Sequence, residues 1–464
     1  MGIPSLGEEY AGADLGDLRL SKRLLGIAER MAEQPDRSFP KAMHGESELE
    51  AVYRFFQNEK VTWRSVLAPH VARTVSRVAN CAEPIVVAHD TTEFGFGGEA
   101  RVDLGRLLQQ GRGFYGHFAL AVGGRKIRDP LGVLALKVIV RDEERVTESA
   151  VARHRNPDKE QRRWLELAEE VEAALEGCIK PIHVMDREAD SYEIFDGMMS
   201  ADRRFVIRLT HNRVLHGGES KLFDELKQVE GIAEREVPLG HRKRSAAPSH
   251  RKIHPPRAAR SAKLAFAATT VCLPRPPHIE SSLAKKLQLN VVRVFEVDTP
   301  AGCEPVEWRL VTTEPIDTTE QVLAIVDFYR KRWVIEEFFK ALKTGCSVEK
   351  RQLESLDGLL KMIALFIPIA WSLLRLRVLA RESADTPADI VLTQAQIAIL
   401  QSTPRSKARI GSNRPSVRDA LLAIAALGGH LPRNGEPGWI TLHRGYEELL
   451  TLERGWLLAR SAEK

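Results

Sequence analysis

The sequence predicts a mixed α/β protein in which a buried sheet is flanked by helical segments toward both ends of the chain. Three observations indicate this fold class. Short runs rich in Val and Ile, bounded by Gly, Pro or charge, predict buried strands between residues 84 and 209. Apolar residues at helical spacing dominate residues 16–80 and again the chain after residue 359. Segments of alternating polarity at 286–297 and 306–315 predict antiparallel strands before a long helix at 319–343.

The bulk composition excludes several classes of protein. The chain has 464 residues, of which 43% are hydrophobic and 28% charged, so wholesale disorder is excluded. Its five cysteines are scattered and never spaced as CxxC, which favours a reducing cytosol over a disulfide framework or a zinc site. The N-terminal residues lack the pattern of a secretory signal. The most apolar segment, 362–374, is too short to span a bilayer and predicts a buried core helix.

The elements follow one another in a definite order. Helices are expected in LGDLRLSKRLLGIAERMAEQ and ELEAVYRFFQN. Strands are expected at 84–90, 118–122, 131–141, 181–186 and 205–209. A helix at 158–177, ending at Gly177, separates the third strand from the fourth. The last third is helical again, broken by a loop at 403–416.

Changes in the hydrophobic pattern of the sequence divide the chain into three parts. A helical part covers residues 1–75, an α/β part covers 76–360, and a second helical part covers 361–464. Within the α/β part, residues from about 212 to 316 predict an inserted antiparallel β subdomain, because helical patterns are missing there.

The net charge of +5 is concentrated in one segment. Residues 237–279 contain no Asp or Glu but nine basic residues, and without these nine the chain would hold 59 basic and 63 acidic residues. The nine are Arg242, Lys243, Arg244, Arg251, Lys252, Arg257, Arg260, Lys263 and Arg275. This run favours a polyanionic partner such as nucleic acid. A solvated, Pro-rich loop without a ligand is an equally acceptable interpretation of the charge run taken alone.

Two predicted strands end in an aspartate. PIVVAHD ends at Asp90, and PIHVMD ends at Asp186. Carboxylates at the carboxyl ends of buried strands are held on a rigid frame, at the edge where open α/β sheets bind ligands. The alternative is structural, since Asp90 and Asp190 could each start a turn or cap a helix.

The segment YRKRWVIEEFFKALKTG, residues 329–345, aligns four polar side chains on one predicted helix. Tyr329, Arg332, Glu336 and Lys343 fall at roughly 0°, 300°, 340° and 320° when each residue turns by about 100°. Glu337 lies off this arc, so Glu336 is the better candidate for chemistry. The alternative is an amphipathic helix with a solvated face and a weak ion pair between Arg332 and Glu336.

Three carboxylates on two strand ends and one helix form an oxygen-only ligand set. Such a set suits Mg²⁺, with Mn²⁺ able to replace it. Two such ions about 3.5 to 4 Å apart can activate a water and stabilise the leaving oxygen of a phosphodiester. Arginine and lysine on the same helix face would then bind the flanking phosphates.

Several motifs together resemble one protein family. "HDTT" at 89–92, "DREAD" at 186–190 and Y-x2-R-x3-E-x6-K at 329–343 resemble the cut-and-paste bacterial transposases of the insertion-sequence-four family, of the transposon-five type. The likeness extends over nearly the whole chain through "YRFFQN" at 53–58, "RGFYGH" at 112–117 and "LLAIAALGG" at 421–429. These last three resemble the family's DNA-binding domain, its second strand and its C-terminal dimerisation region.

The resemblance implies a ribonuclease-H-like core with a DDE triad, in which Asp90, Asp186 and Glu336 hold two Mg²⁺ ions. It implies a helical N-terminal DNA-binding domain and a C-terminal dimerisation domain. In this family water attacks at the transposon end, and the freed 3′ hydroxyl attacks the opposite strand to form a hairpin. The hairpin is reopened and the 3′ ends join target DNA. The expected partners are transposon-end and target DNA and a second copy of the chain, in the bacterial cytoplasm.

The resemblance also assigns DNA contacts. It implies that Tyr329, Arg332 and Lys343 contact the transposon end, and that Trp308 stacks on a flipped base beside the hairpin. A half-buried strand aromatic is the structural alternative for Trp308. By the same resemblance the remaining DNA contacts are Arg54, Arg187 and Arg208, together with Arg19, Lys22 and Arg23 in the end-recognition region.

The match is incomplete at two positions. Val334 stands where a basic residue is expected, and Glu93 is also unlike the family pattern. Two other functions therefore stay open. One is a metal-dependent DNA nuclease without strand transfer, and the other is a non-catalytic DNA-binding relative that represses transposition.

Overall fold

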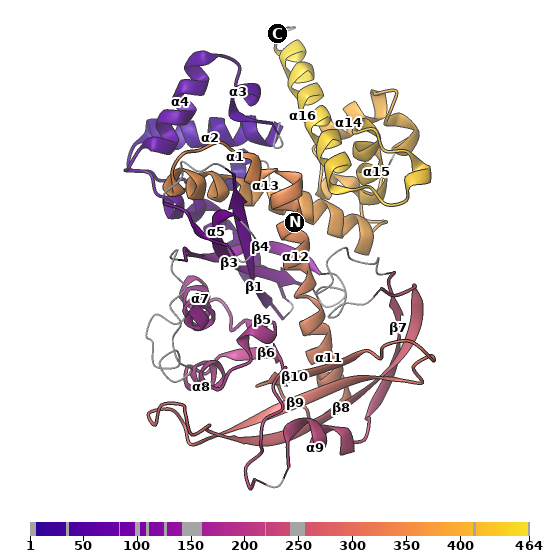
Figure 1. Cartoon of the computed structure of the whole chain (residues 1–464). Helices are drawn as coiled ribbons and strands as arrows, with labels where there is room; N and C mark the ends of the chain where they lie inside the picture. Colours follow the sequence, from indigo (N-terminus) through magenta and orange to yellow (C-terminus); the bar gives the residue numbers. More distant parts are fainter. Residues whose placement is uncertain are drawn as a thin grey trace. The chain divides into compact units, whose positions relative to one another are not determined.

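The computed structural model describes residues 6–33, 37–82, 84–97, 103–107, 111–124, 128–141, 160–218, 220–241, 256–411 and 414–462. Part of the predicted basic run, including Arg242 to Arg244, Arg251 and Lys252, lies outside the described residues. The chain divides into two compact units, coloured along the sequence in Figure 1. Unit 1 is Met1–Val146, Glu169–Ile179 and Trp333–Lys464, and unit 2 is Thr147–Ala168 and Lys180–Arg332.

Unit 1 contains an antiparallel sheet. Its strands are β1 (Val86–Phe96), β2 (Gly105–Arg106), β3 (Arg112–Gly123) and β4 (Asp129–Ile139). Strand β3 is central, with β1 along one edge and β4 and the short β2 along the other. All three neighbours run antiparallel to β3, and almost every β3 side chain is buried. The predicted buried strands at 118–122 and 131–141 are therefore confirmed.

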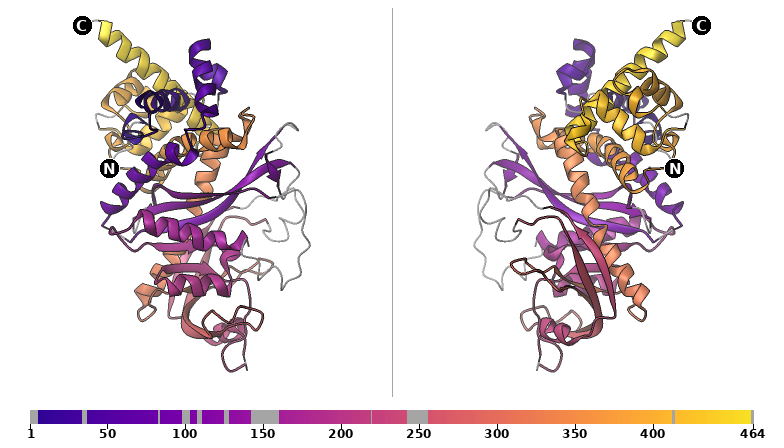
Figure 2. Two further views of the ribbon diagram at one scale, coloured as in Figure 1. Left: turned by 90° about the vertical axis from the view of Figure 1, so that its left-hand side faces the viewer. Right: turned by 90° about the vertical axis from the view of Figure 1, so that its right-hand side faces the viewer.

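Helices from both ends of the chain complete unit 1. The N-terminal helices are α1 (Leu6–Glu9), α2 (Leu18–Glu33), α3 (Phe39–Ala42), α4 (Glu46–Gln57) and α5 (Trp63–Ala79). The later helices are α12 (Trp333–Lys340), α13 (Leu356–Glu382), α14 (Gln394–Ser402), α15 (Val417–Leu427) and α16 (Trp439–Ala462). Helices α2 and α16 contact each other although they come from opposite ends of the chain (Figure 2). The sequence prediction of helical segments at both ends is confirmed.

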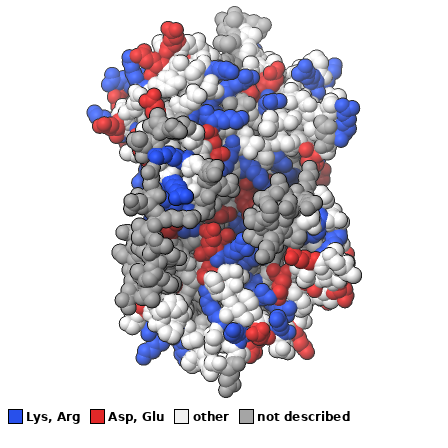
Figure 3. Space-filling view, viewed as in Figure 1, with Lys and Arg blue, Asp and Glu red and all other residues white. Residues whose placement is uncertain are grey.

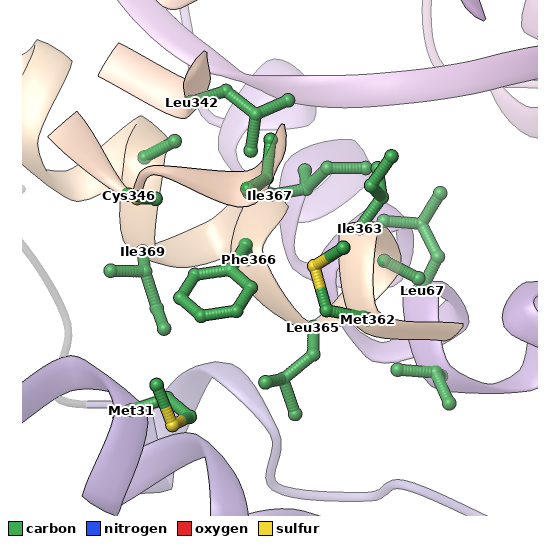
Figure 4. Close-up of a cluster of buried hydrophobic side chains, with 14 of the residues drawn as sticks. Met31, Leu67, Leu342, Cys346, Met362, Ile363, Leu365, Phe366, Ile367 and Ile369 are labelled. Carbon is green, nitrogen blue, oxygen red and sulfur yellow. The ribbon is translucent and has the colours of Figure 1, made fainter. Parts of the chain in front are cut away.

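Helix α13 is the centre of the unit 1 core. It is long and apolar enough to cross a membrane, but 94% of its most apolar window is buried inside the protein. A helix that is apolar on every side is stable in water only when it is packed on every side. Figure 4 shows its side chains, including Met362, Phe366 and Ile369, together with Met31 of α2 and Leu67 of α5. The predicted buried core helix is confirmed, and it is longer than the apolar segment that predicted it.

A buried lysine joins α13 to the N-terminal helices. Lys361 is fully buried, and its Nζ donates to the carbonyl oxygens of Phe56 (3.1 Å) and Asn58 (2.9 Å). These carbonyls lie at the end of α4, where a helix has no further N–H groups to pair with its last carbonyls. The ammonium of Lys361 on α13 therefore binds carbonyl oxygens at the end of the YRFFQN motif.

Unit 2 contains a second, mixed set of strands. They are β5 (Ile182–Met185), β6 (Arg204–Arg208), β7 (Ala233–Leu239), β8 (Arg260–Pro274), β9 (Lys286–Val297) and β10 (Glu307–Thr312). Their order is β5-β6-β10-β9-β8-β7. Strands β5 and β6 are parallel, and every other neighbouring pair is antiparallel. The predicted antiparallel strands at 286–297 and 306–315 are confirmed by β9 and β10, and these two strands pair with each other.

The helices of unit 2 cover these strands. They are α8 (Tyr192–Ser200), α9 (Leu222–Gln228) and α11 (Thr319–Arg330), and α7 (Arg163–Ala174) begins in unit 2 and ends in unit 1. Helices α9 and α11 both contact the long antiparallel strands. The side chains of Arg235 on β7 and Asp327 on α11 form an ion pair of 2.7 Å. The whole chain is thus mixed α/β, as the sequence predicts.

Two predicted elements are wrong in detail. Strand β1 does not end at Asp90 but continues to Phe96, because its pairing with β3 runs from Val86 to Phe96 without interruption. The single helix expected at 319–343 is interrupted at Lys331 and Arg332 and ends in a π-helical turn at Ala341–Gly345. The interruption coincides with the passage of the chain from unit 2 into unit 1.

Candidate active site

Asp186 lies at the carboxyl end of a buried parallel strand, as predicted. Strand β5 ends at Met185, whose partner on the parallel strand β6 is Ile207. Asp186 and Arg208 are the residues that follow these two, so both lie at the same edge of the sheet. The Oδ1 of Asp186 accepts a hydrogen bond of 2.8 Å from the N–H of Glu188 and caps a short 3₁₀ turn at Arg187–Ala189. The carboxylate is only half-buried, so it is fixed in position while still accessible to a ligand.

Tyr329 brings several predicted site residues together inside unit 2. Burial raises the pKa of its phenol, while the charges of Arg332 and Arg208 oppose this shift and the charge of Asp186 adds to it. Since only 5% of Tyr329 and 9% of Arg332 are exposed, this pair is held by its surroundings before any DNA binds. The phenol is neutral near pH 7 and can donate a hydrogen bond.

Trp308 adjoins the same group. It lies on β10 opposite Val294, and its ring packs edge to face on Tyr329 with centroids 5.8 Å apart. The indole is half-buried, so part of it is accessible. Among the described residues of unit 2, the ring of Trp308 packs on Tyr329, and the charges of Asp186, Arg208 and Arg332 act on its phenol.

Asp90 and Glu336 both belong to unit 1. Along β1, residues Val86 to His89 are buried, and Asp90 is the first residue that is only half-buried. Its Oδ1 accepts a hydrogen bond of 2.8 Å from the N–H of Thr91. The expectation of a strand end is wrong for Asp90, but the residue does end the continuous run of buried residues that begins the strand.

Helix α12 packs on the face of the sheet that carries Asp90. The cross-strand partner of Asp90 is Phe118, whose ring contacts Phe338 and Phe339 of α12 with centroids 5.8 and 5.5 Å apart. Directly opposite residues of an antiparallel pair point to the same face. Asp90 therefore shares a face with the helix that carries the half-buried Glu336.

The acidic residue next to Glu336 has a separate partner. Both carboxylate oxygens of Glu337 accept from Nη1 of Arg381, at 3.0 and 3.2 Å. This ion pair joins α12 to the last turn of α13. The preference for Glu336 over Glu337 as the candidate ligand is therefore consistent with the surroundings of Glu337.

Lys343 lies on the π-helical turn and contacts the end of β1. Its Nζ is 3.4 Å from Oε1 of Glu349 and 5.4 Å from the centre of the Phe94 ring. The same Oε1 accepts a hydrogen bond of 2.9 Å from the N–H of Gly95. The ammonium of Lys343 therefore lies beside β1, at residues that follow Asp90 along the strand. No sequence signal singled out Glu349, because its partner Gly95 is 254 residues away in the chain.

The second aspartate of DREAD is structural. Asp190 is 3% exposed, and its Oδ2 accepts from the N–H groups of Thr210 (2.6 Å) and His211 (2.8 Å). Its Oδ1 also pairs with Arg213 at 2.5 Å. These partners occupy Asp190, so the alternative interpretation of this residue as a structural one is favoured.

Glu188 is the acidic residue closest in sequence to Asp186. Desolvation and the neighbouring Asp186 raise the pKa of its carboxyl, against the opposing charge of Arg163. The Nη2 of Arg163 lies 2.7 Å from Oε2 of Glu188. Glu188 therefore has a cationic partner of its own within unit 2.

Two of the predicted DNA contacts are exposed on the surface of their units. Arg187 is exposed on the 3₁₀ turn after Asp186, while Arg54 lies on α4 in an exposed ion pair with Glu50.

The structure also describes the two residues that depart from the family pattern. Val334 is 4% exposed in the core, where a basic side chain would not reach solvent, and Glu93 is half-buried opposite Tyr115.

The candidate ligands fit a hard divalent cation by their chemistry. Asp90, Asp186 and Glu336 offer only carboxylate oxygens, which Mg²⁺ and Mn²⁺ prefer. In the part of the chain that the structure describes, no group of three or more His, Cys, Asp or Glu side chains is positioned to hold a metal ion.

Two family models match the chain. Residues 5–61 match the transposase DNA-binding model, and residues 136–369 match the model of the transposase DDE domain. The second match covers half of the chain and includes Asp186, Tyr329 and Glu336. The chain belongs to the transposases with a DDE domain. The predicted transposase function is thereby confirmed at this level, with a DNA-binding domain ahead of a DDE domain.

One solved transposase structure is similar over much of this transposase. It is the cryo-EM structure of the piggyBac transposase synaptic complex with hairpin DNA, which has 10% sequence identity. The match covers 82% of this chain and 77% of that chain with a TM-score of 0.36. A score this low adds nothing to what the family models show. Asp90 precedes the residues matched to the DDE domain, so its assignment depends on the sequence motif and on its place on β1.

Proposed function

We propose that this transposase is a cut-and-paste enzyme of the insertion-sequence-four, transposon-five type, with a ribonuclease-H-like core. The observation that carries the proposal is the group around Tyr329. Asp186, Arg208, Trp308 and Arg332 come from separate parts of unit 2. The ring of Trp308 packs on Tyr329, and the charges of the other three act on its phenol. They are the residues that the resemblance assigns to the metal and to the transposon end.

Asp90, Asp186 and Glu336 are the proposed metal ligands. When bound, two Mg²⁺ ions would activate a water or a 3′ hydroxyl and stabilise the leaving oxygen. The half-burial of all three carboxylates supports this role, since a ligand must be fixed and yet reach the substrate. Mn²⁺ is expected to replace Mg²⁺ because it prefers the same oxygen ligands.

The protein's own groups orient the DNA. Arg332 and Arg208 supply positive charge for the phosphates that flank the scissile bond, and the neutral phenol of Tyr329 donates a hydrogen bond to a phosphate oxygen. Trp308 offers the accessible part of its indole to an unpaired base. A flipped base would relieve the bend that a hairpin imposes on the end of the duplex.

The proposed sequence of reactions uses one active site. Water first attacks the phosphorus at the transposon end, which breaks the P–O3′ bond and leaves a 3′ hydroxyl. This hydroxyl then attacks the opposite strand, forming a hairpin and releasing the flanking DNA. A second water opens the hairpin, and the 3′ hydroxyl finally attacks a phosphodiester of the target. Each step is a phosphoryl transfer in which one P–O bond forms and another breaks.

DNA recognition is assigned to the N-terminal helices. The exposed basic residues Arg19, Lys22 and Arg23 lie on α2, and Arg54 lies on α4, inside the matched DNA-binding stretch. On the face drawn in Figure 3, basic side chains are interspersed with acidic ones rather than gathered in a single-sign surface. We propose that two copies of the chain act on two paired transposon ends, in the bacterial cytoplasm.

Cleavage of end-labelled DNA tests the proposal. The substrate is a duplex carrying the terminal repeats that flank the coding sequence, with and without Mg²⁺. Wild type is expected to give Mg²⁺-dependent nicks and hairpins at the repeat boundary, and Asp186→Asn is expected to give neither. Nicks without hairpins would instead indicate a nuclease. Binding to the repeats without cleavage in Mg²⁺ or Mn²⁺ would indicate a non-catalytic relative.

A further inference from the structure

Glu349 lies where the chain turns from α12 toward α13. Ser347 adopts a left-handed backbone with φ of +49°, which is uncommon for a residue other than glycine. This turn leads into a 3₁₀ segment, Val348–Lys350, that contacts β1. Glu349 is the middle residue of the segment, so the backbone itself directs it toward the strand that carries Asp90.

One carboxylate oxygen of Glu349 serves two partners. It accepts from the N–H of Gly95 at 2.9 Å and lies 3.4 Å from Nζ of Lys343. The backbone bond fixes the oxygen, and the fixed oxygen in turn restrains a long and otherwise flexible ammonium side chain. Lys343 has 26% of its side chain exposed, so the pair is partly shielded from solvent but still open to a phosphate.

The helix that carries Lys343 is irregular at this residue. Lys343 lies in the π-helical turn Ala341–Gly345, where the backbone leaves the regular α-helical path of α12. Such turns are rare and often occur at functional sites. The ammonium of Lys343 lies 3.4 Å from Oε1 of Glu349, which restrains it from outside the helix.

We infer that Glu349 is a positioning residue that holds the ammonium of Lys343 against the end of β1, the strand that also carries Asp90. The inference depends on the proposed function, in which Lys343 binds a phosphate next to the scissile bond. Glu349 does not touch the DNA itself. Its effect on catalysis passes through Lys343.

Two substitutions separate the two contacts of Glu349. In Glu349→Gln the amide oxygen can still accept from Gly95, but the ion pair with Lys343 is lost. Glu349→Ala removes both contacts. Glu354→Gln is the matched control, because Glu354 is exposed in the following loop and the substitution removes the same charge. Hydrogen exchange of peptides covering 92–97 is expected to show protection at Gly95 in Glu349→Gln and loss of it in Glu349→Ala.

A double-mutant cycle with Lys343→Ala provides the decisive measurement. The probe is a labelled duplex ending in the element's terminal repeat, cleaved in Mg²⁺. Glu349→Gln is expected to slow cleavage by roughly tenfold without changing the melting temperature. The substitution leaves the ammonium of Lys343 poorly oriented toward the phosphate but does not disturb the fold. In the Lys343→Ala background the same substitution should have no further effect.

Two results would overturn the inference. One is cleavage by Glu349→Gln at the wild-type rate, which would mean that Glu349 only braces β1. The other is that the fold-changes of Glu349→Gln and Lys343→Ala multiply, because independent residues do not share an effect. If wild type binds the duplex without cutting it, the proposed function fails. The same cycle measured on affinity would then decide the inference, with coupling supporting it and additivity overturning it.

Discussion

Asp186 and Asp190 lie four residues apart in one motif and have opposite surroundings. Asp186 is half-buried with one backbone bond, whereas Asp190 is buried with two backbone donors and Arg213. We expect Asp186→Asn to abolish cleavage and leave the free energy of unfolding within about 1 kcal/mol of wild type. Asp190→Asn should instead lower it by about 3 to 5 kcal/mol, because it leaves Arg213 without its buried counter-charge.

Urea denaturation and the cleavage assay together test this contrast. Asp190→Asn protein that remains folded at low temperature should still cut DNA, since Asp190 is not among the proposed metal ligands. A stable but inactive Asp190→Asn protein would show that the two aspartates share the chemical role.

Glu336 and Glu337 form a second contrasting pair at the residue scale. Glu336→Gln is expected to reduce cleavage at least about 100-fold, since even residues that only support metal ligands cost 10- to 100-fold when removed. Glu337→Gln removes the partly exposed ion pair with Arg381 and should change stability by no more than about 1 kcal/mol, with near-normal cleavage. Single-turnover cleavage rates of the two variants test this expectation. Equal losses in both would contradict the assignment of Glu336 alone.

Sequence reasoning at this scale places a residue correctly where its position follows from its own strand or helix. Asp186 was predicted because a Val- and Ile-rich run ends directly before it, and the strand does end there. Glu349 could not be predicted, because its function depends on the backbone of Gly95 in a distant strand. Contacts between such separated residues are created by tertiary packing, which no local pattern encodes.

At the scale of elements, the crossing of α15 and α16 predicts a sharp effect of a single methyl group. A Cβ at Gly445 of α16 would lie 1.7 Å from the carbonyl oxygen of Ile424, and one at Gly428 would lie 2.0 Å from that of Thr441. The two backbones are therefore in direct contact. Gly445→Ala is expected to lower the free energy of unfolding by about 1 to 3 kcal/mol, because backbone atoms cannot move aside cheaply.

Gly455→Ala on the same helix is the matched control for the crossing. A Cβ at Gly455 would meet nothing within 4 Å, so alanine should stabilise the helix by up to about 1 kcal/mol. Thermal melting followed by circular dichroism distinguishes the two variants. A melting temperature of Gly445→Ala equal to that of wild type would mean that α15 and α16 are not in such close contact in solution.

Elements were predicted well where their periodicity is uninterrupted. The alternation of 286–297 matches β9 at both ends, and the apolar run around Met362 lies inside α13. The helix at 319–343 was predicted as continuous because no Gly or Pro interrupts it before Gly345. Its actual interruption at Lys331 and Arg332 shows that the arc of Tyr329, Arg332, Glu336 and Lys343 is not a property of one helix. Tyr329 and Arg332 belong to unit 2, and Glu336 and Lys343 belong to unit 1.

At the scale of the whole molecule, residues from distant parts of the sequence meet in a buried polar network in unit 1. The carboxylate of Glu9 is 1% exposed and pairs with Nδ1 of His70 at 2.5 Å and with Nη1 of Arg77 at 2.9 Å. His70 Nε2 accepts from the N–H of Val133, so Nδ1 carries the proton and the imidazole is neutral. The ring of Trp371 packs against both partners of Glu9, with the imidazole of His70 at its edge and the guanidinium of Arg77 4.0 Å from its centre.

This network predicts that the protein begins to lose stability at a pH well above the range in which carboxyl groups usually titrate. Burial alone would raise the pKa of Glu9, but the hydrogen bonds from His70 and Arg77 and the charge of Arg77 lower it to about 2. Burial also lowers the pKa of His70 despite the neighbouring Glu9. Both groups bind protons more weakly in the folded state, so the unfolded state gains protons first as the pH falls. Stability should therefore decrease below about pH 6.5 through His70 and decrease further below about pH 4.5 through Glu9.

The loss attributable to Glu9 is about 3 kcal/mol when its pKa rises from about 2 to the ordinary 4.5 on unfolding. Urea denaturation of wild type at pH 7, 5.5 and 4 measures the dependence, with Glu9→Gln and Asp17→Asn as comparisons. Glu9→Gln should be less stable than wild type at pH 7 and should depend less on pH between 5.5 and 4. Arg19 lowers the pKa of Asp17, but Asp17 is at the surface where solvent screens the pair, so its substitution should change the slope much less than Glu9→Gln does. Equal slopes for wild type and Glu9→Gln would mean that Glu9 is not held as a buried carboxylate, and the close packing of α1 against α5 would then need another cause.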